Sequence, residues 1–227
     1  MQELNSFLFP SLEIPTAAPI LVLASASPRR ADLLRTLGVP FVVAASDVPE
    51  PRPTADDESQ PANFVEKLAR FKAENCDETQ FADGSDARVV VLAADTIVWH
   101  EGTILNKPKD KDDARAMLRR LRGKTHTVYT GVCLRMGDHF CIGHEATLVQ
   151  FGHASDYWID AYVETGEPSD KAGAYAAQGK GAVLIERIAG DFWNVVGLPL
   201  WKLSRMFEQI GMPLEDWWQQ KDNATSA

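Results

Sequence analysis

A continuous apolar run at residues 89–93, Val-Val-Val-Leu-Ala, constrains the fold more than any other segment. Runs of this kind are typical of strands buried inside a sheet, whereas half-exposed strands alternate apolar and polar residues. The run stops at Asp95, and apolar residues resume at 97–99. We therefore expect a buried strand that Asp95 interrupts.

Strand-like and helix-like segments alternate on both sides of this run. The first helix is expected at residues 27–38, where Ser27 caps the helix, Pro28 suits its first turn and Gly38 ends it. Alternation of this kind predicts an α/β fold. Further helices are expected at 61–76, 110–123, 155–163 and 198–210, and strands at 20–24, 41–45, 125–135, 139–151, 182–188 and 192–196.

The length of 227 residues favours one large domain over two small ones. Residues 1–19 carry three prolines and no clear periodicity, which predicts a leader that is draped on the fold or disordered. We expect a single catalytic domain at residues 20–212. Residues 213–227 are expected to form a C-terminal tail of the same character as the leader.

Charge and apolar pattern exclude several classes of partner. The 23 basic and 32 acidic residues give a formal charge of -9, which repels duplex nucleic acid over most of the surface. No apolar run is as long as the about 18 residues that a membrane span needs. Glu3 and Glu13 stand where a signal peptide carries basic residues. We therefore expect a cytoplasmic protein without a membrane or a duplex nucleic acid as partner.

The cysteines indicate reduced thiols, because Cys76, Cys133 and Cys141 are odd in number and form no C-x-x-C pair. His139, Cys141 and His144 are spaced closely enough to suggest a metal trio. A strand, however, directs residues 139 and 141 to one face and residue 144 to the other. A plain strand is therefore favoured over a zinc site.

An anion site is expected where residues 23–30, Leu-Ala-Ser-Ala-Ser-Pro-Arg-Arg, pass from a strand into a helix. Free backbone N–H groups and the positive end of the helix dipole favour phosphate there. Ser25, Ser27, Arg29 and Arg30 are the candidate ligands. The alternative is an ordinary Ser-capped helix with two solvated arginines.

Two carboxylates and two lysines complete the candidate machinery. Asp95 in a buried strand is costly to desolvate unless it binds a cation or acts as a base, and Glu50 lies in a proline-rich loop. Lys72 ends the apolar stripe of a helix, and Lys107 follows an apolar segment. The alternatives are a turn-capping aspartate, a lysine that snorkels along its own stem and an exposed turn lysine.

A segment rich in glycine and polar residues, 165–181, permits close approach of its backbone to a ligand. Within it Gln178 offers an amide with both a donor and an acceptor, which suits the edge of a nucleobase. The alternative is a surface loop of turn residues.

These segments together resemble the Maf-type nucleoside triphosphate pyrophosphatases, once described as septum-formation inhibitors. The resemblance covers about residues 20–203. It is carried by ASASPRR at 24–30, LARFKA at 68–73, LAADTIV at 92–98, ILNKPKD at 104–110, TGEPSDKAGAYAAQG at 165–179 and GDFWNVVGLPL at 190–200.

The resemblance implies an elongated α/β domain with a mixed, twisted sheet and a central cleft, similar to inosine triphosphate pyrophosphatases. It implies a hydrolase that cleaves the α–β phosphoanhydride bond of a nucleoside triphosphate with a divalent cation, Mg²⁺ or Mn²⁺, and that forms a homodimer. It assigns Asp95 as proton acceptor and relates Arg29, Thr96 and Gln178 to substrate choice. Its other functional positions fall on Glu50, Lys72 and Lys107.

The subfamily resembled most is the one that hydrolyses dTTP and UTP, because the Gln178 amide can pair with the O4 acceptor and N3–H donor of a pyrimidine. In this reading Glu50 is the candidate metal ligand, and Lys72 and Lys107 stabilise charge on the phosphates. Two alternatives stay open. One is hydrolysis of 7-methyl-GTP, and the other is a non-catalytic nucleotide-binding regulator of septum formation.

Overall fold

The computed structural model describes residues 19–81 and 88–218. Most of the expected leader and the end of the expected tail therefore lie outside the described residues. In the described part of the tail, Leu214 and Trp217 are buried, and the Trp217 ring packs edge-on against Phe207 with centroids 5.3 Å apart. The domain boundary at residue 212 stays a prediction.

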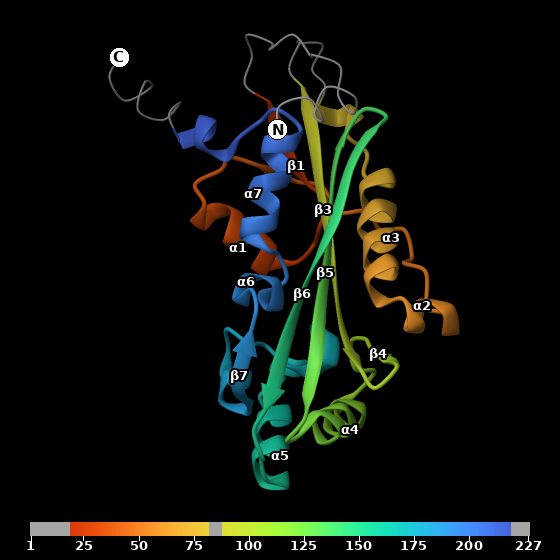
Figure 1. Ribbon diagram of the computed structural model, residues 1–227, viewed down its shortest axis with the longest axis vertical. Helices are drawn as coiled ribbons and strands as arrows, with labels where there is room; N and C mark the ends of the chain where they lie inside the picture. The colour runs from red at the N-terminus through yellow and green to blue at the C-terminus, as the bar shows by residue number, and fades with distance from the viewer. Residues whose placement is uncertain (1–18, 82–87, 219–227) are drawn as a thin grey trace.

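A mixed sheet of seven strands forms the long axis of the molecule (Figure 1). Its spatial order is β2-β1-β3-β5-β6-β7, with β4 paired to β3 outside this path. β1 is parallel to β2 and β3, and the other pairs are antiparallel. The strands are β1 (Ile20–Leu23), β2 (Val42–Val43), β3 (Val89–His100), β4 (Thr103–Leu105), β5 (Thr125–Met136), β6 (His139–Phe151) and β7 (Ile185–Ala189).

Helices cover both faces of the sheet, and none among the described residues is long and apolar enough to cross a bilayer. The α-helices are α1 (Pro28–Thr36), α2 (Ala55–Ser59), α3 (Pro61–Glu74), α4 (Lys111–Leu121), α5 (Asp156–Glu164), α6 (Phe192–Val196) and α7 (Leu200–Gln209). Short 3-10 helices span Thr79–Phe81, Glu167–Asp170, Ala172–Ala174 and Lys180–Leu184. The mixed sheet with helices on its faces confirms the expected α/β fold.

Most of the expected elements are present with ends shifted by a few residues. Asp110 and Ser155 cap α4 and α5 by accepting hydrogen bonds from the backbone N–H groups of Asp113 and Trp158. The strand expected at 41–45 is reduced to β2. Ser27 occupies the N-cap position of α1 but its side chain makes no capping hydrogen bond, so its expected capping role is wrong.

The strand expected at residues 192–196 is also wrong, because this segment forms helix α6. Asp191 begins the helix by accepting a hydrogen bond from the Trp193 backbone N–H at 2.7 Å. Asn194 is fully buried, and its amide donates to the Val128 carbonyl and to Thr147 Oγ1 at 3.0 and 2.9 Å. These tertiary hydrogen bonds outweigh the strand propensity of the aromatic and β-branched neighbours.

The expected interruption of the central strand at Asp95 is wrong as well. β3 runs unbroken from Val89 to His100, and in its pairing with β5 Asp95 lies opposite Gly131. The Asp95 side chain points to the face of the sheet that α3 covers, so the pairing of β3 with β5 continues past it.

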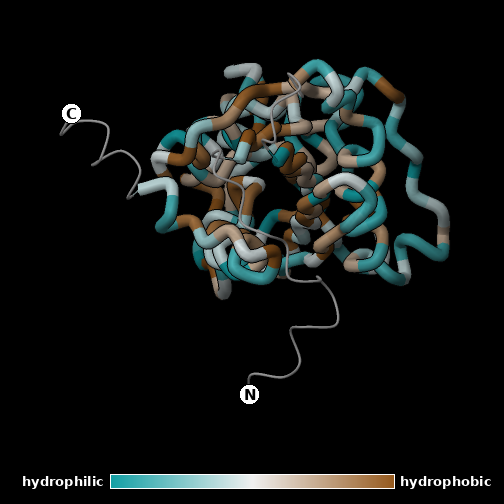
Figure 2. The backbone as a smooth tube through the Cα atoms, turned by 90° about the horizontal axis from the view of Figure 1, so that it is seen from above, coloured by the Kyte–Doolittle hydropathy of each residue, from teal (hydrophilic) through white to brown (hydrophobic). Residues whose placement is uncertain are grey.

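Alternation along β3 directs its side chains to two different layers. Figure 1 shows α3 on one side of the long strands and α1 and α7 on the other, and Figure 2 shows the same backbone from above, coloured by hydropathy. Residues 90, 92 and 94 share a core with α1 and α7, and residues 91 and 93 share a second core with α3. Asp95 continues the face toward α3 and Thr96 the face toward α1.

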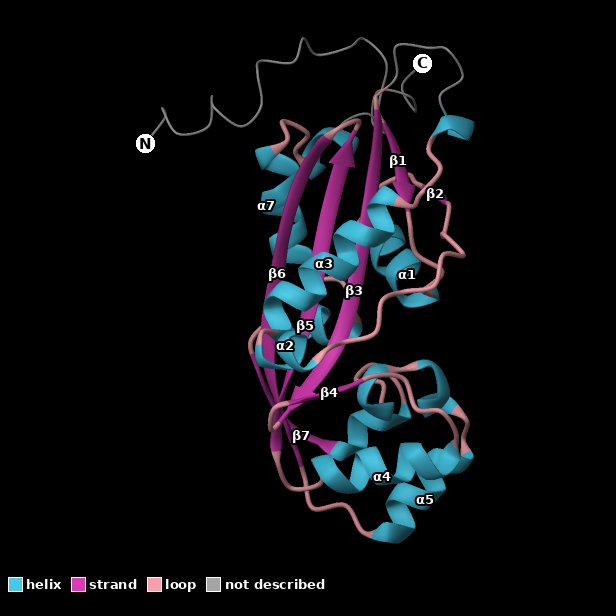
Figure 3. Cartoon of the chain, turned by 90° about the vertical axis from the view of Figure 1, so that its right-hand side faces the viewer, coloured by secondary structure: helices cyan, strands magenta, loops and turns pink. Residues whose placement is uncertain are grey.

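A second part of the molecule packs around the far end of the long strands, where α4 and α5 lie with β4 and β7 (Figure 3). Its core joins Val98 of β3 and Val128 of β5 to Leu118 of α4 and Ile159 of α5. The two parts thus share β3 and β5, which contribute residues to both cores.

One edge of β3 is left uncovered by the described strands between these parts, although the side chains of β3 are largely buried. β1 pairs with residues 89–92 of β3, and β4 pairs with residues 98–100. No described strand pairs with residues 93–97 along this edge. Asp95 and Thr96 lie at the centre of the uncovered stretch.

Helix α3 approaches the sheet more closely than a side chain on β5 would allow. A Cβ atom added at Gly131 would lie 2.2 Å from the Val65 carbonyl oxygen of α3. Gly131 therefore sets the distance at which α3, and with it Lys72 two turns farther along, meets β3.

We expect Gly131→Ala to lower the free energy of unfolding by about 2 kcal/mol, because backbone contact with α3 leaves no room for the methyl group. Gly143→Ala on β6 is the matched control, since its added Cβ would meet only ordinary contacts at 3.5 Å or more. Chemical denaturation measures both. Equal stability of the two variants would contradict the close packing of α3.

Candidate active site

A cleft of about 740 Å³ opens along the uncovered edge of β3. Every residue selected from the sequence lines it, although these residues come from segments far apart in the chain. They are Ser25, Ser27, Arg29, Arg30, Glu50, Lys72, Asp95, Thr96, Lys107 and Gln178. The individual roles expected for these residues stay predictions.

Lys72 joins the two candidate carboxylates. Its ammonium group hydrogen-bonds to Asp95 Oδ1 and lies 3.0 Å from Glu50 Oε1. The side chains of Lys72 and Asp95 are only 17% and 13% exposed, whereas that of Glu50 is 49% exposed. The buried charge of Asp95 is thus compensated, and Glu50 extends the acidic group toward the open side of the cleft.

Arg30 is buried and directs its hydrogen bonds to the protein. Its Nε donates to the Gly197 carbonyl at 2.8 Å, Nη1 to Ser25 Oγ at 3.0 Å and Nη2 to Thr96 Oγ1 at 3.0 Å. Burial lowers the pKa of the Arg30 guanidinium, and the nearby Asp95 carboxylate partly offsets this. Arg30 therefore supports the wall of the cleft, and its expected contact with a substrate stays a prediction.

The Arg30 site depends on a glycine. Gly197 ends α6 with φ at +122°, and a Cβ added there would lie 3.4 Å from Thr96 Oγ1 and 3.8 Å from Arg30 Nε. Since these distances are ordinary contacts, it is the positive φ, which is strained for other residues, that requires glycine here.

Asp170 and Lys171 extend the ionic site, although neither was singled out within segment 165–181. Asp170 accepts from Arg29 Nη1 at 3.2 Å and from Lys171 Nζ at 2.6 Å. Burial raises the pKa of Asp170, but the hydrogen bond and charge of Lys171, together with Arg29, outweigh it and leave the pKa lowered. Because Arg29 belongs to α1 and Asp170 to the opposite part, this pair spans the cleft.

Two buried hydroxyls anchor the segment that carries Gln178. Tyr162 donates to Glu167 Oε1 at 2.9 Å and accepts from the Ala176 backbone N–H at 3.1 Å. The Tyr175 hydroxyl lies 2.8 Å from Nε2 of His126, whose pKa burial lowers to about 3. Gln178 follows these anchors and is exposed at the cleft.

Lys107 is exposed, as the alternative of a turn lysine predicts, yet it lines the cleft. The preceding residue, Asn106, accepts a hydrogen bond from the Gly173 backbone N–H at 3.2 Å. The Lys107 turn and the Gln178 segment are thereby connected.

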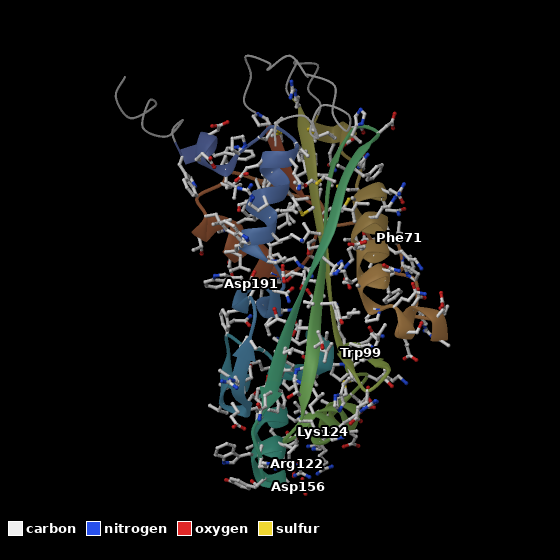
Figure 4. The ribbon with its side chains drawn as sticks, viewed as in Figure 1. Phe71, Trp99, Arg122, Lys124, Asp156 and Asp191 are labelled. Atoms are coloured by element: carbon white, nitrogen blue, oxygen red, sulfur yellow. The ribbon has the colours of Figure 1, made fainter. Side chains whose placement is uncertain are left out.

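The cleft combines a cationic region with an apolar wall. Six basic side chains against four acidic ones line it, in a protein whose overall charge is -9. The apolar wall comes from α3 through Phe64, Leu68 and Phe71, the last of which is labelled in Figure 4. This combination suits a molecule with a flat apolar part and a polyanionic part.

Comparisons with known proteins agree with this chemistry. A family model described as "Maf-like protein" matches residues 20–210. A dTTP/UTP pyrophosphatase of Symbiobacterium thermophilum is 48% identical over 86% of this chain and 95% of that protein. Proteins of the same name from Caldicellulosiruptor bescii and Bacillus cytotoxicus are 42% and 45% identical, over 86% and 83% of this chain and 96% and 94% of theirs.

We expect Asp170→Asn to tighten the binding of inorganic pyrophosphate by roughly three- to tenfold, because it releases Arg29 and Lys171 from a competing carboxylate. Calorimetry with pyrophosphate measures the dissociation constant. Asp156→Asn is the control, since it removes the same charge at the far end of the molecule, where Asp156 pairs with Arg119 and Arg122 (Figure 4). Weaker binding of pyrophosphate to the Asp170 variant than to the control would show that Asp170 favours binding of the anion.

Proposed function

The chain belongs to the Maf family, and we propose that it is a nucleoside triphosphate pyrophosphatase that hydrolyses dTTP and UTP to the monophosphate and pyrophosphate. The observation that carries the proposal is the Lys72–Asp95 pair at the uncovered edge of β3, inside a cleft with an excess of cations. Such a cleft offers a base for water and countercharges for a triphosphate in one place.

The triphosphate lies along the N-terminus of α1 in this proposal. Ser27, whose hydroxyl is not used for capping, and Arg29 are on this helix, while Lys107 and Lys171 approach from the opposite part of the molecule. The positive end of the helix dipole and charge-assisted hydrogen bonds favour phosphate oxygens here. Arg29 exchanges its contact with Asp170 for a phosphate when the substrate binds.

Asp95 accepts a proton from the attacking water. As the water oxygen forms its bond to phosphorus, the α–β phosphoanhydride bond breaks and pyrophosphate leaves with the electron pair. Lys72, bound to Asp95, keeps the carboxylate oriented toward the cleft, and Lys107 offsets the charge that grows on the leaving group.

Gln178 reads the base in this proposal. Its amide presents a donor to O4 and an acceptor to N3–H, and the wall that includes Phe71 supplies apolar contact for the flat ring. 7-Methylguanine carries a positive charge, which favours a carboxylate and aromatic stacking over a neutral amide. The pyrimidine nucleotides are therefore the proposed substrates.

A divalent cation, Mg²⁺ or Mn²⁺, is part of the proposal, with Glu50 as its protein ligand. Glu50 fits this role because its carboxylate is half exposed in the cleft and lies beside Asp95 on the same lysine. Magnesium sites in phosphate chemistry commonly use one or two carboxylates and complete the coordination with phosphate oxygens and water. When bound, the cation neutralises phosphate charge and polarises the phosphoryl oxygens.

We further propose that the protein is a cytoplasmic homodimer. The three cysteines are buried free thiols, which suits a reducing compartment. Large side chains on α6 and α7 are exposed, among them Trp193 and Trp201 at 42% and 74%. Light scattering tests the dimer, which has twice the mass of the 25.1 kDa chain.

The test of the proposed function is a phosphate-release assay coupled to added inorganic pyrophosphatase. The panel contains dTTP, UTP, GTP and 7-methyl-GTP, each with Mg²⁺, with Mn²⁺ and with EDTA. We expect metal-dependent turnover that is fastest with dTTP or UTP. Binding without turnover of any nucleotide would favour the regulator of septum formation, and a preference for 7-methyl-GTP would favour the other subfamily.

We expect Asp95→Asn to lower kcat by about 10²- to 10⁴-fold, because the nearly isosteric amide cannot accept the proton. Asp160→Asn is the control, since Asp160 pairs with Arg115 on the surface outside the cleft. Circular dichroism during denaturation checks that both variants fold. A folded Asp95 variant that retains more than about a tenth of the wild-type rate would show that Asp95 is not the base.

A further inference from the structure

Two hydroxyl groups line the cleft on either side of the Arg30 guanidinium. Arg30 donates to Ser25 Oγ through Nη1 and to Thr96 Oγ1 through Nη2, at 3.0 Å each. A hydroxyl has one proton to donate and two lone pairs that accept. Since an arginine only donates, each hydroxyl has given one lone pair to Arg30.

Ser25 uses its second lone pair as well. Its Oγ also accepts the backbone N–H of Ser27 at 3.2 Å. Both acceptor positions of this buried hydroxyl are therefore occupied by the protein, and only its proton remains for a ligand in the cleft.

Thr96 has the opposite role, because its proton is used by the protein and a lone pair remains for a ligand. Its Oγ1 lies 3.0 Å from Oγ1 of Thr130, a fully buried residue of β5. Thr130 Oγ1 lies 2.9 Å from the carbonyl oxygen of Asn194, and since a carbonyl cannot donate, the single proton of Thr130 goes to Asn194. Thr96 must then donate its own proton to Thr130, so that one lone pair is all that Thr96 offers to the cleft.

The backbone carbonyl of Asn194, which accepts the Thr130 proton, is held in place by the side chain of the same residue. The Asn194 side chain is fully buried and donates to the Val128 carbonyl of β5 and to Thr147 Oγ1 of β6. The direction of the hydrogen bonds from Thr96 to Thr130 to Asn194 is thus determined by the fold.

We propose that Arg30 and Thr130 give the two hydroxyls opposite hydrogen-bonding roles, so that Ser25 donates to a phosphate oxygen and Thr96 accepts from a donor group of the nucleoside. The proposal rests on the proposed function for its substrate class and adds Thr130 as a positioning residue that determines specificity. The phosphate oxygens of a triphosphate are acceptors, so they suit Ser25 and do not suit Thr96. The donors that a pyrimidine nucleotide carries are its sugar hydroxyls and its N3–H, and Gln178 takes the N3–H in the proposed function, so a sugar hydroxyl remains for Thr96.

The experiment compares the dissociation constants of dTTP and two analogues by calorimetry in EDTA, where metal-dependent turnover does not interfere. One analogue, 3′-fluoro-3′-deoxythymidine triphosphate, carries a fluorine that can accept but not donate in place of the 3′-hydroxyl, and the other, N3-methylthymidine triphosphate, lacks the N3–H that Gln178 reads. Wild type should bind the 3′-fluoro analogue at least about tenfold more weakly than dTTP, because the Thr96 acceptor is left unpaired. The N3-methyl analogue is the control, because its penalty comes from Gln178 and should be the same in all variants of Thr130.

Thr130→Val removes the acceptor for the Thr96 proton while keeping the shape of the side chain. Thr96 is then free to donate to the fluorine, so the penalty for the 3′-fluoro analogue should fall to less than about threefold, whereas Thr130→Ser should keep it. A purely structural role of Thr130 would weaken all three ligands equally and leave their ratio unchanged. If Thr130→Val does not fold, Thr130→Ala removes the same acceptor without a branched side chain.

Two results would overturn the proposal. Equal binding of dTTP and the 3′-fluoro analogue by wild type would show that Thr96 accepts from no sugar hydroxyl. An unchanged penalty in the folded Thr130→Val or Thr130→Ala variant would show that Thr130 does not direct the Thr96 proton. Absence of hydrolysis by wild type in the nucleotide panel, with the binding ratios as expected, would instead reject the proposed function and leave the hydrogen-bonding roles intact.

Discussion

The uncovered stretch of β3 is the constraint on which the site depends. Because β1 pairs with residues 89–92 and β4 with residues 98–100, Asp95 and Thr96 lie where the sheet edge is open. Alternation along the strand then sends these two neighbours to opposite faces, Asp95 toward Lys72 of α3 and Thr96 toward Arg30 of α1. One dipeptide thereby joins the helix that balances the carboxylate to the helix that would receive the phosphates.

Local signals in the sequence were sufficient for most of the secondary structure. Caps such as Asp110 and periodic apolar stripes act within a few residues, so α4 and α7 could be predicted with nearly correct ends. The same rules predicted a strand instead of a helix at residues 192–196, because the contacts of Asn194 that stabilise the helix are with β5 and β6, which are distant in the chain. Asp95 was misjudged for a related reason, since its charge is balanced by a lysine on another element and the strand has no need to end there.

The members of the site could be predicted, whereas their partners could not. Motif residues such as Lys72 and Gln178 carry a chemical signature in the sequence, and the structure brings them to one cleft. Thr130 has no such signature, because an isolated threonine in a strand is typical of any half-buried sheet. The role proposed for Thr130 depends on tertiary contacts, at 2.9 Å to Asn194 and at 3.0 Å to Thr96, which the sequence does not show.

The charged groups of the cleft fall into two sets that respond differently to an incoming anion. Arg29 and Lys171 bind Asp170, so these two cations have a carboxylate partner that a polyanion can replace, whereas Lys72 stays bound to Asp95. Buried charges without such partners would be costly, which explains why the cleft carries acids among its bases. Arg30, in contrast, uses three of its five N–H donors on the protein, at Gly197, Ser25 and Thr96, and these bonds hold the wall of the cleft. The exchangeable pairs can therefore adjust to the ligand while Arg30 keeps the hydroxyls beside it in a constant orientation.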